Sequence, residues 1–245
     1  MLMQEVGAVR AIGPSAKLQI AAVQASDLRF AYGPRREILR IPELRVDAGS
    51  SVLLFGPSGS GKTTLLGLLA GVLTASSGRL SVLGHDLTQM SNAQRDRFRG
   101  AHIGYIFQLF NLIPYLTVLE NITLPCRLSL ERRKRLNGVP LDRAAHEVAE
   151  HLGIAPLLGE NAQDLSVGQQ QRVAAARALI GTPEIVIADE PTSSLDFDHR
   201  GRFLDLLFAN CRKAGSTLVF VSHDRTLRCW FDCCISLPDI NRPAP

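Results

Sequence analysis

A glycine-rich run near residue 60 has the residue types and spacing that hold the phosphates of a nucleotide. It matches the pattern G-x-x-x-x-G-K-[ST], with Gly56, Gly61, Lys62 and Thr63 at the fixed positions. Glycines let backbone N–H groups turn toward an anion, because no Cβ obstructs the loop. Lys62 can then reach the β- and γ-phosphates, and the Thr63 hydroxyl can take one position on Mg²⁺. The residues expected to contact nucleotide are Gly56, Pro57, Ser58, Gly59, Ser60, Gly61, Lys62, Thr63 and Thr64.

The segments on either side of this run have the character that such a loop requires. Residues 51–55 form a short apolar stretch typical of a buried strand, and residues 65–70 continue as an apolar helix. A strand, a loop and a helix in this order place the positive end of the helix at the phosphates. A glycine-rich turn that matches by chance is the alternative, and these flanking segments disfavour it.

Two adjacent acids follow a second apolar stretch further along the chain. Residues 184–188 read as a buried strand, which ends in Asp189 and Glu190. Asp189 can hold Mg²⁺ through a water, and Glu190 can polarise an attacking water as a general base. An ordinary core strand with a solvated acidic end is the alternative. Because Asp189 and Glu190 lie downstream of a phosphate-binding loop, the catalytic interpretation is favoured.

Residues 165–169, Leu-Ser-Val-Gly-Gln, form a second candidate phosphate-contacting loop. Ser166 and Gln169 have the spacing of a capping box at the start of a helix that continues to residue 179. The Ser166 side chain, the Gly168 N–H and the helix dipole would point at one spot, which suits a γ-phosphate. The alternative is that Ser166 only caps the helix and binds no ligand. A single chain has no evident use for this loop, so the sequence suggests an ATPase that completes its site by pairing with a second one.

Taken in order, these motifs resemble those of the ATP-binding subunits of ABC transporters, over about residues 22–237. The resemblance implies that Tyr32, in Phe-Ala-Tyr-Gly, stacks on adenine. It implies that Gln108, in Tyr-Ile-Phe-Gln, reaches Mg²⁺ and relays to a membrane partner. It also implies that residues 193–196, Ser-Ser-Leu-Asp, contact the opposite subunit, and that Ser166, Gly168 and Gln169 bind the nucleotide held by that subunit.

His223 matches the switch histidine of the same family. The strand expected over residues 217–221 would deliver it to the carboxyl edge of a parallel sheet, where such sheets bind ligands. There it would donate a hydrogen bond to the γ-phosphate and hold Glu190 and the water in place. An ordinary loop histidine is the alternative, and this is the assignment for the other five: His85, His102, His146, His151 and His199.

The alternation of strands and helices predicts a parallel α/β core. The resemblance implies the P-loop NTPase core of the ABC ATPase type, with a β-rich subdomain and an inserted α-helical subdomain. We expect a poorly ordered leader over residues 1–20 and an ABC ATP-binding domain over 21–245, with the helical subdomain at about 109–164. Within these, further strands are expected at 79–83 and 102–107, and helices at 141–152 and after Asp196.

Composition is that of an ordinary globular chain. It has 245 residues, of which 46% are hydrophobic and 20% charged, and a net charge of +4. The longest apolar stretch, 65–73, is far shorter than the roughly 20 residues of a membrane-spanning helix, so the chain is not expected to form a pore itself. The first residues lack the pattern of a secretory signal.

Two local clusters have competing interpretations. The five cysteines give no even disulfide framework, which favours a reducing cytoplasm. The spacing Cys229-x-x-x-Cys233-Cys234 could suit a metal or redox site, but apolar filling is the favoured interpretation. The basic run at residues 132–135 is expected to be a solvated face, with contact to anionic lipid headgroups as the minority alternative.

The resemblance implies an ATPase subunit that dimerises on ATP and drives a separate membrane permease. It would use ATP and Mg²⁺, with Glu190, His223 and Lys62 as catalytic residues and Thr63, Gln108 and Asp189 around the metal. A second ATP-binding subunit, identical or not, would be its partner; no nucleic acid is expected, and the location is the cytoplasmic face of the membrane. Residues 91–104 and 108–122 resemble the lipoprotein-release and macrolide-export branch.

Two other classes stay open at this point. A non-transport ABC ATPase acting on nucleic acid or ribosomes usually carries two cassettes or long coiled coils, and this sequence shows neither. A scaffold that binds ATP without hydrolysing it is disfavoured by the presence of Glu190 and His223.

Overall fold

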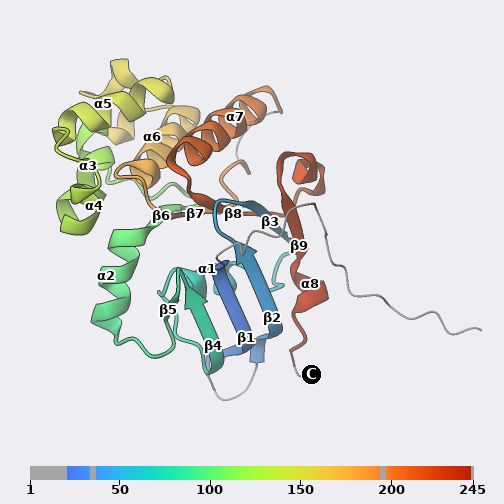
Figure 1. The fold of residues 1–245 in the computed structure, drawn as a ribbon. Coiled ribbons are helices and arrows are strands. Elements are labelled where there is room, and N and C mark those ends of the chain that lie inside the picture. The colour runs from blue at the N-terminus through green and yellow to red at the C-terminus, as the bar shows by residue number, and fades with distance from the viewer. Residues whose placement is uncertain (1–20, 34–36, 194–196, 244–245) are drawn as a thin grey trace, which may run out of the picture.

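A five-stranded parallel sheet forms the centre of the computed structural model, which describes residues 21–33, 37–193 and 197–243 (Figure 1). Its strand order is β6-β7-β8-β3-β9, and each neighbouring pair is parallel. The strands are β3 (Ser51–Phe55), β6 (Ile103–Ile106), β7 (Ile185–Asp189), β8 (Thr217–Ser222) and β9 (Cys233–Ser236).

A second, antiparallel sheet lies against one face of the first (Figure 1). Its order is β2-β1-β4-β5, built from β1 (Ala21–Ala31), β2 (Glu37–Asp47), β4 (Ser77–Val82) and β5 (His85–Asp86). Along β1 and β2, buried and exposed residues largely alternate, as expected for strands with one face on a core. Strand β1 of this sheet ends at Ala31, directly before Tyr32.

The helices fall mainly on the other face of the parallel sheet, where α3, α4, α5, α6 and α7 gather (Figure 1). Capping boxes begin three of the helices, with the pairs Ser91/Gln94, Thr117/Glu120 and Ser166/Gln169. Within the described residues, no helix has both the length and the apolar character needed to cross a membrane. The bounds are α1 (Lys62–Leu69), α2 (Asn92–His102), α3 (Val118–Leu128), α4 (Leu130–Lys134), α5 (Leu141–His151), α6 (Val167–Leu179), α7 (Phe197–Ala214) and α8 (Leu237–Ile240), with 3₁₀ turns at Ala155–Leu157, Ala162–Asp164 and Arg225–Trp230.

The parallel sheet separates two hydrophobic clusters. In β3, Leu53 and Phe55 face the cluster of α3, α5, α6 and α7, whereas Val52 and Leu54 face the cluster of α1 and the antiparallel sheet. Since both faces of β3, β7 and β8 are covered, these strands have apolar residues at nearly every position and read as continuous apolar runs. The sheet is therefore a rigid support for whatever its carboxyl edge carries.

The strands and helices expected from the sequence are present with slightly different bounds, and the α/β fold is confirmed. The strands predicted at 79–83 and 102–107 are β4 and β6, and the helix predicted at 141–152 is α5, followed by Gly153 with a φ of 67°. The predicted leader, residues 1–20, and most of the predicted loop at 193–196 lie outside the described residues.

The cysteine interpretation is wrong for the C-terminal group. Cys126 and Cys211 are buried, but Cys229, Cys233 and Cys234, which were expected to fill apolar space, are exposed. The reason is that β9 is an edge strand and Cys229 lies in a surface 3₁₀ turn, so these side chains are not enclosed by a core. Among the described residues, no cluster of His, Cys, Asp and Glu has the arrangement of a metal site.

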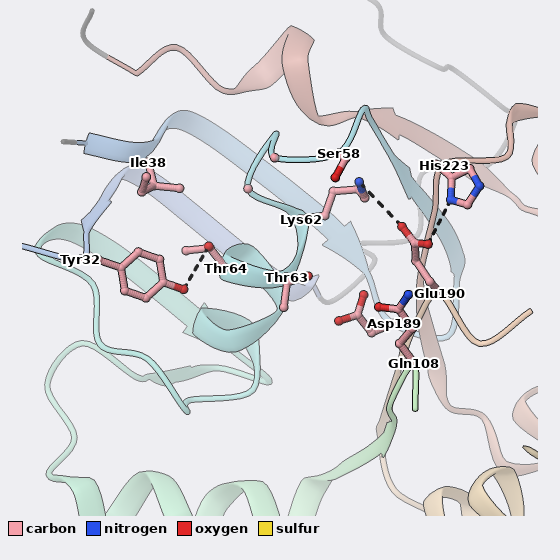
Figure 2. Close-up of a pocket in the computed structure, with 12 residues that line it drawn as sticks. Tyr32, Ile38, Ser58, Lys62, Thr63, Thr64, Gln108, Asp189, Glu190 and His223 are labelled. Carbon is pink, nitrogen blue, oxygen red and sulfur yellow. Dashed lines mark hydrogen bonds and ion pairs between the residues drawn. The ribbon is translucent and has the colours of Figure 1, made fainter. Parts of the chain in front are cut away.

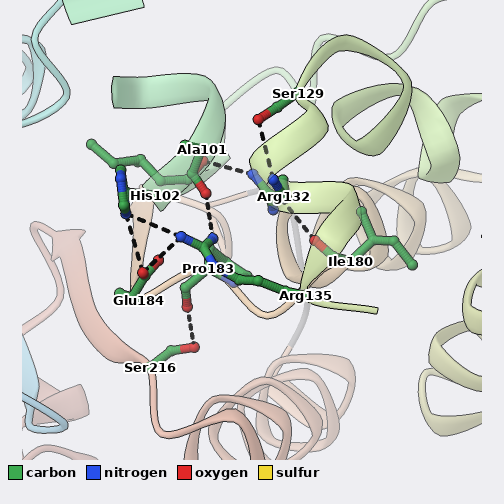
Figure 3. A network of polar contacts seen from close by, with 10 residues as sticks. Ala101, His102, Ser129, Arg132, Arg135, Ile180, Pro183, Glu184 and Ser216 are labelled. Atoms are coloured by element: carbon green, nitrogen blue, oxygen red, sulfur yellow. Dashed lines mark hydrogen bonds and ion pairs between the residues drawn. The ribbon is translucent and has the colours of Figure 1, made fainter. Parts of the chain in front are cut away.

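The basic run at 132–135 is also not a uniformly solvated face, as Figure 3 shows. The Arg132 side chain is buried, and its guanidinium donates to the carbonyls of Ile180, Ile103 and Ala178. Arg135 donates to Glu184 at 2.7 Å, and within this run only Arg133 and Lys134 are exposed. Burial lowers the pKa of Arg132 to about 10, so it stays charged at neutral pH. Arg132 therefore ties α4 to the end of α6 and the start of β6.

Candidate nucleotide-binding site

Four neighbouring strands of the parallel sheet end at one edge and deliver most of the predicted residues there (Figure 2). The loop after β3 contains Lys62, β6 leads to Gln108, and β7 ends in Asp189 followed by Glu190. His223 directly follows β8. They surround a cavity of about 700 Å³, lined by Tyr32, Ile38, Ser58, Gly59, Gly61, Lys62, Thr63, Thr64, Gln108, Asp189, Glu190 and His223.

The glycine-rich loop wraps around the ammonium group of Lys62. This buried side chain donates to the carbonyl oxygens of Gly56 and Pro57, at 2.9 and 3.0 Å. Gly61 has a φ of 98°, and a Cβ there would lie 2.7 Å from a methyl carbon of Leu39. Glycine is thus required at residue 61 by backbone shape and by space. Gly56, Pro57 and Ser60 form the back of the loop and do not line the cavity.

Glu190 stands between two nitrogen groups. Its Oε1 lies 3.9 Å from Nζ of Lys62, and its Oε2 lies 3.0 Å from Nδ1 of His223. The carboxylate is 17% exposed, whereas His223 is 64% exposed and so open to a ligand in the cavity. The position of Glu190 is fixed by its backbone, with a φ of 44° and an N–H that donates to the Val221 carbonyl at 3.0 Å. A left-handed glutamate is uncommon, and such strain tends to mark functional sites.

Asp189 is buried beside Glu190 and Thr63. Burial raises the pKa of its carboxyl group, and the negative charge of Glu190 raises it further, while a hydrogen bond from Thr63 and the charge of Lys62 act in the opposite direction. Asp189 and Glu190 thus bring two carboxylates to a cavity with one lysine. A cation near Asp189 would relieve this imbalance.

The donor set of the cavity fits Mg²⁺. Thr63, Gln108 and Asp189 all line it, and each offers a side-chain oxygen, the donor atom that this ion prefers. The hydrogen bond between Thr63 and Asp189 keeps two of these oxygens together. The residues predicted around the metal are therefore brought to one place by the fold.

Tyr32 lies at the opposite end of the cavity from Glu190 (Figure 2). Its ring is 67% exposed and packs edge-on against Phe30, with centroids 4.8 Å apart. Its hydroxyl lies 3.2 Å from that of Thr64, which fixes the ring over the start of α1. An exposed ring held from behind offers a flat surface for a base. Ile38, which the sequence interpretation did not include, lines the same end.

Ser166, Gly168 and Gln169 do not line this cavity. The predicted capping box is confirmed, since Ser166 Oγ accepts from the Gln169 N–H and Gln169 Oε1 accepts from the Ser166 N–H. Ser166 is exposed at the start of α6, with its hydroxyl proton available to an external acceptor. Within one chain, this helix start is thus a separate surface from the cavity.

Arg177, near the end of α6, is a structural residue that the sequence interpretation missed. Its guanidinium donates to the carbonyls of Asn111 and Phe110, at 2.7 and 2.5 Å. These two residues have φ values of 48° and 60°, so the chain turns sharply just after Gln108. Burial lowers the pKa of Arg177 to about 10. The helix that begins at Ser166 is therefore bonded to the loop that carries Gln108. In the sequence, the only indication of this role is that Arg177 is a single charged residue among the alanines at 174–178.

The chain is similar to known proteins in sequence and in structure. The family model described as "ABC transporter" matches residues 39–193. The ABC transporter ATP-binding protein YbbA of Escherichia coli is 42% identical over 200 residues, which cover 82% of this chain and 86% of that protein. The lipoprotein-releasing system ATP-binding protein LolD of Porphyromonas gingivalis is 35% identical over 217 residues, which cover 89% of this chain and 96% of that protein.

A solved structure extends the comparison to three dimensions. The ATP-binding cassette MJ0796, in a dimeric post-hydrolysis state bound to ADP and Pi, aligns with a TM-score of 0.79 and 31% sequence identity. The alignment covers 91% of this chain and 97% of the cassette. No comparison supports the alternative of an ATPase that acts on nucleic acid.

Proposed function

This chain belongs to the ABC transporter family as an ATP-binding subunit that hydrolyses ATP, and on that premise we propose how its residues divide the work. Lys62 and the glycine-rich loop bind the phosphates, Tyr32 supports the adenine, and Glu190 and His223 act at the γ-phosphate. The observation that carries the proposal is the position of Glu190, with one oxygen toward Lys62 and the other 3.0 Å from His223.

The arrangement supports general-base catalysis by Glu190. A carboxylate fixed by a left-handed backbone and a histidine contact can orient a water and accept its proton as the water attacks the γ-phosphate. His223, exposed beside it, can donate a hydrogen bond to the phosphate. Mg²⁺ bound near Thr63, Gln108 and Asp189 would neutralise phosphate charge. On nucleotide binding, the Lys62 ammonium would donate to phosphate oxygens in place of the carbonyls of Gly56 and Pro57.

We propose further that the site is completed by a second copy of the chain. Ser166 is exposed and Gly168 is half-buried at a helix start that offers hydrogen-bond donors, but both lie outside their own chain's cavity. A second chain, placed face to face, could bring this surface to the γ-phosphate. The dimeric state of the cassette MJ0796 is consistent with such pairing. ATP would then hold the dimer together, and hydrolysis would release it.

A membrane permease is the proposed partner, which places the chain at the cytoplasmic face of a membrane. A groove of about 680 Å³ adjoins the strand that leads to Gln108. Its lining combines apolar side chains, among them Phe107, Leu128 and Leu130, with charged ones such as Arg97 and Glu131. Leu128 and Leu130 are 79% and 73% exposed. Arg177 also lines the groove, so a helix of the permease seated there would contact the same residue that holds the loop after Gln108. The likeness to LolD favours a role in lipoprotein release or export.

The test of the catalytic proposal compares Glu190→Gln with Glu150→Gln, a surface substitution on α5. Glu190→Gln is expected to bind ATP but to hydrolyse it at least about a hundredfold more slowly, because the base is lost. It should accumulate as a dimer with ATP on size-exclusion chromatography. Glu150→Gln should behave as the parent chain. Unchanged phosphate release by Glu190→Gln would remove Glu190 from this role.

A further inference from the structure

A second cavity lies on the helical side of the molecule, away from the nucleotide site. Its volume is about 270 Å³, and it is bounded by α5, the segment at residues 136–139, the end of α6 and the end of α7. It shares no lining residue with the nucleotide cavity. It therefore separates helices of the predicted helical subdomain from the helix α7 of the core.

The floor of this cavity is apolar. Leu179 and Ile180, at the end of α6, are buried, and so is Ala144 of α5. Leu136 and Val148 form part of the walls. The volume lies just below the range for small-molecule sites, about 300–1,000 Å³, so an occupant must be smaller than a drug-sized ligand. Such a floor suits a short hydrocarbon chain.

The mouth of the cavity carries a positive charge. Nζ of Lys213 lies 3.4 Å from Nε2 of His151, so the lysine can donate to a neutral imidazole. Glu147 also lines the mouth, but its carboxylate accepts from Arg143 at 3.3 Å on the same helix. Among the described residues, Lys213 makes no ion pair. An anionic group would thus find an available ammonium at the edge of an apolar floor.

We propose that this cavity binds a small amphipathic carboxylate, with an acyl tail of about eight carbons on Leu179 and Ile180 and its carboxylate at Lys213. The tail buries apolar surface, and the carboxylate forms a charge-assisted hydrogen bond with the lysine. His151 accepts from the same lysine and holds it at the mouth.

The cavity also adjoins the hydrogen bonds that join α4 to the end of α6 and to the start of β6. The carbonyl of Ile180 accepts from Arg132 Nε at 2.8 Å, and Arg132 donates in turn to Ile103 at the start of β6 (Figure 3). β6 leads to Gln108. An occupant that touches Ile180 and α7 together would restrict movement between them and so slow the ATPase; this effect, unlike binding itself, rests on the proposed function.

The experiment titrates the purified full chain with octanoate and follows binding by NMR. We expect saturable binding with a Kd of about 1 mM, as the ligand's size predicts. Lys213→Met, which keeps the apolar stem, should weaken binding about tenfold. Lys134→Met, the matched change at an exposed lysine on α4, should leave it unchanged. Octanamide, which has the same tail without the charge, should bind weakly to both the parent chain and Lys213→Met.

A second variant tests the position of the tail. Ala214→Phe, at the end of α7, would fill the cavity and should abolish octanoate binding. Absence of saturable binding to the parent chain, or equal affinity in Lys213→Met and Lys134→Met, would overturn the proposal, as would undiminished binding to a folded Ala214→Phe. ATPase activity is measured in parallel: a rate that falls with the same half-saturation as binding supports the coupling, and an unchanged rate with octanoate bound overturns the coupling alone.

Discussion

Nδ1 of His223 lies 3.0 Å from Oε2 of Glu190, although 33 positions separate them in the sequence. The contact arises because β7 and β8 are adjacent and parallel, so the residues after them meet at one edge. It joins the proposed base to the proposed γ-phosphate contact.

Loss of the imidazole is expected to affect turnover more than binding. In His223→Ala, Glu190 loses its contact and the γ-phosphate loses a donor, so kcat should fall by about a hundredfold or more while KM for ATP changes little. Steady-state phosphate release measures both constants. His146→Ala, which removes a half-exposed histidine on α5 paired with Glu150, is the control and should retain parental kinetics. A KM effect without a kcat effect would make His223 a binding residue instead.

The raised pKa of Asp189 predicts a pH dependence of stability. Because the folded chain holds this proton more tightly than the unfolded chain, the folded state binds more protons between the two pKa values. The free energy of unfolding should therefore fall as the pH rises from the pKa of Asp189 in the unfolded chain to its higher pKa in the folded chain. Asp189→Asn removes this titration.

Without nucleotide or Mg²⁺, Asp189→Asn should be more stable than the parent chain at neutral pH, and the difference should vanish at acidic pH. Thermal unfolding across pH measures this. The same variant should lose about a hundredfold or more of its Mg²⁺-dependent hydrolysis, because the site loses a charged oxygen. Equal stability of the two chains at neutral pH would mean that burial of this carboxylate costs nothing.

Arg132 is expected to be a major contributor to stability. Arg132→Met leaves the carbonyls of Ile180, Ile103 and Ala178 without their donor in a buried place, and should lower the free energy of unfolding by about 2–4 kcal/mol. Urea unfolding gives the value. Arg133→Met, the neighbouring change at an exposed position, should stay within about 0.5 kcal/mol of the parent chain. Equal losses in both would contradict the described network.

The sequence was sufficient to predict strands β3, β6, β7 and β8 of the parallel sheet and the residues at their carboxyl ends, but not the edge strand β9. Strand β7 reads as a continuous apolar run because both its faces are covered, and the acids at its end then have a definite place. The capping box at Ser166 is equally local, because it depends only on residues three positions apart. Such features are fixed by short-range patterns.

Features that depend on tertiary contacts were not predictable. Arg132 and Lys134 look alike in a basic run, and only the approach of α6 buries the former. Arg177 similarly lies among alanines, and its role depends on the left-handed turn at Phe110 and Asn111. The exposure of Cys233 follows from β9 being the edge strand, which a sequence does not reveal.

The central claim is that the γ-phosphate site is shared, because Ser166 and Gly168 lie outside the cavity that holds Lys62. The most direct measurement is the ATPase rate per chain as a function of protein concentration, with the monomer and dimer fractions measured by sedimentation at each point. We predict a rate that rises with the dimer fraction and approaches zero for dilute monomer. A full rate, independent of concentration, from a chain that stays strictly monomeric would contradict the claim.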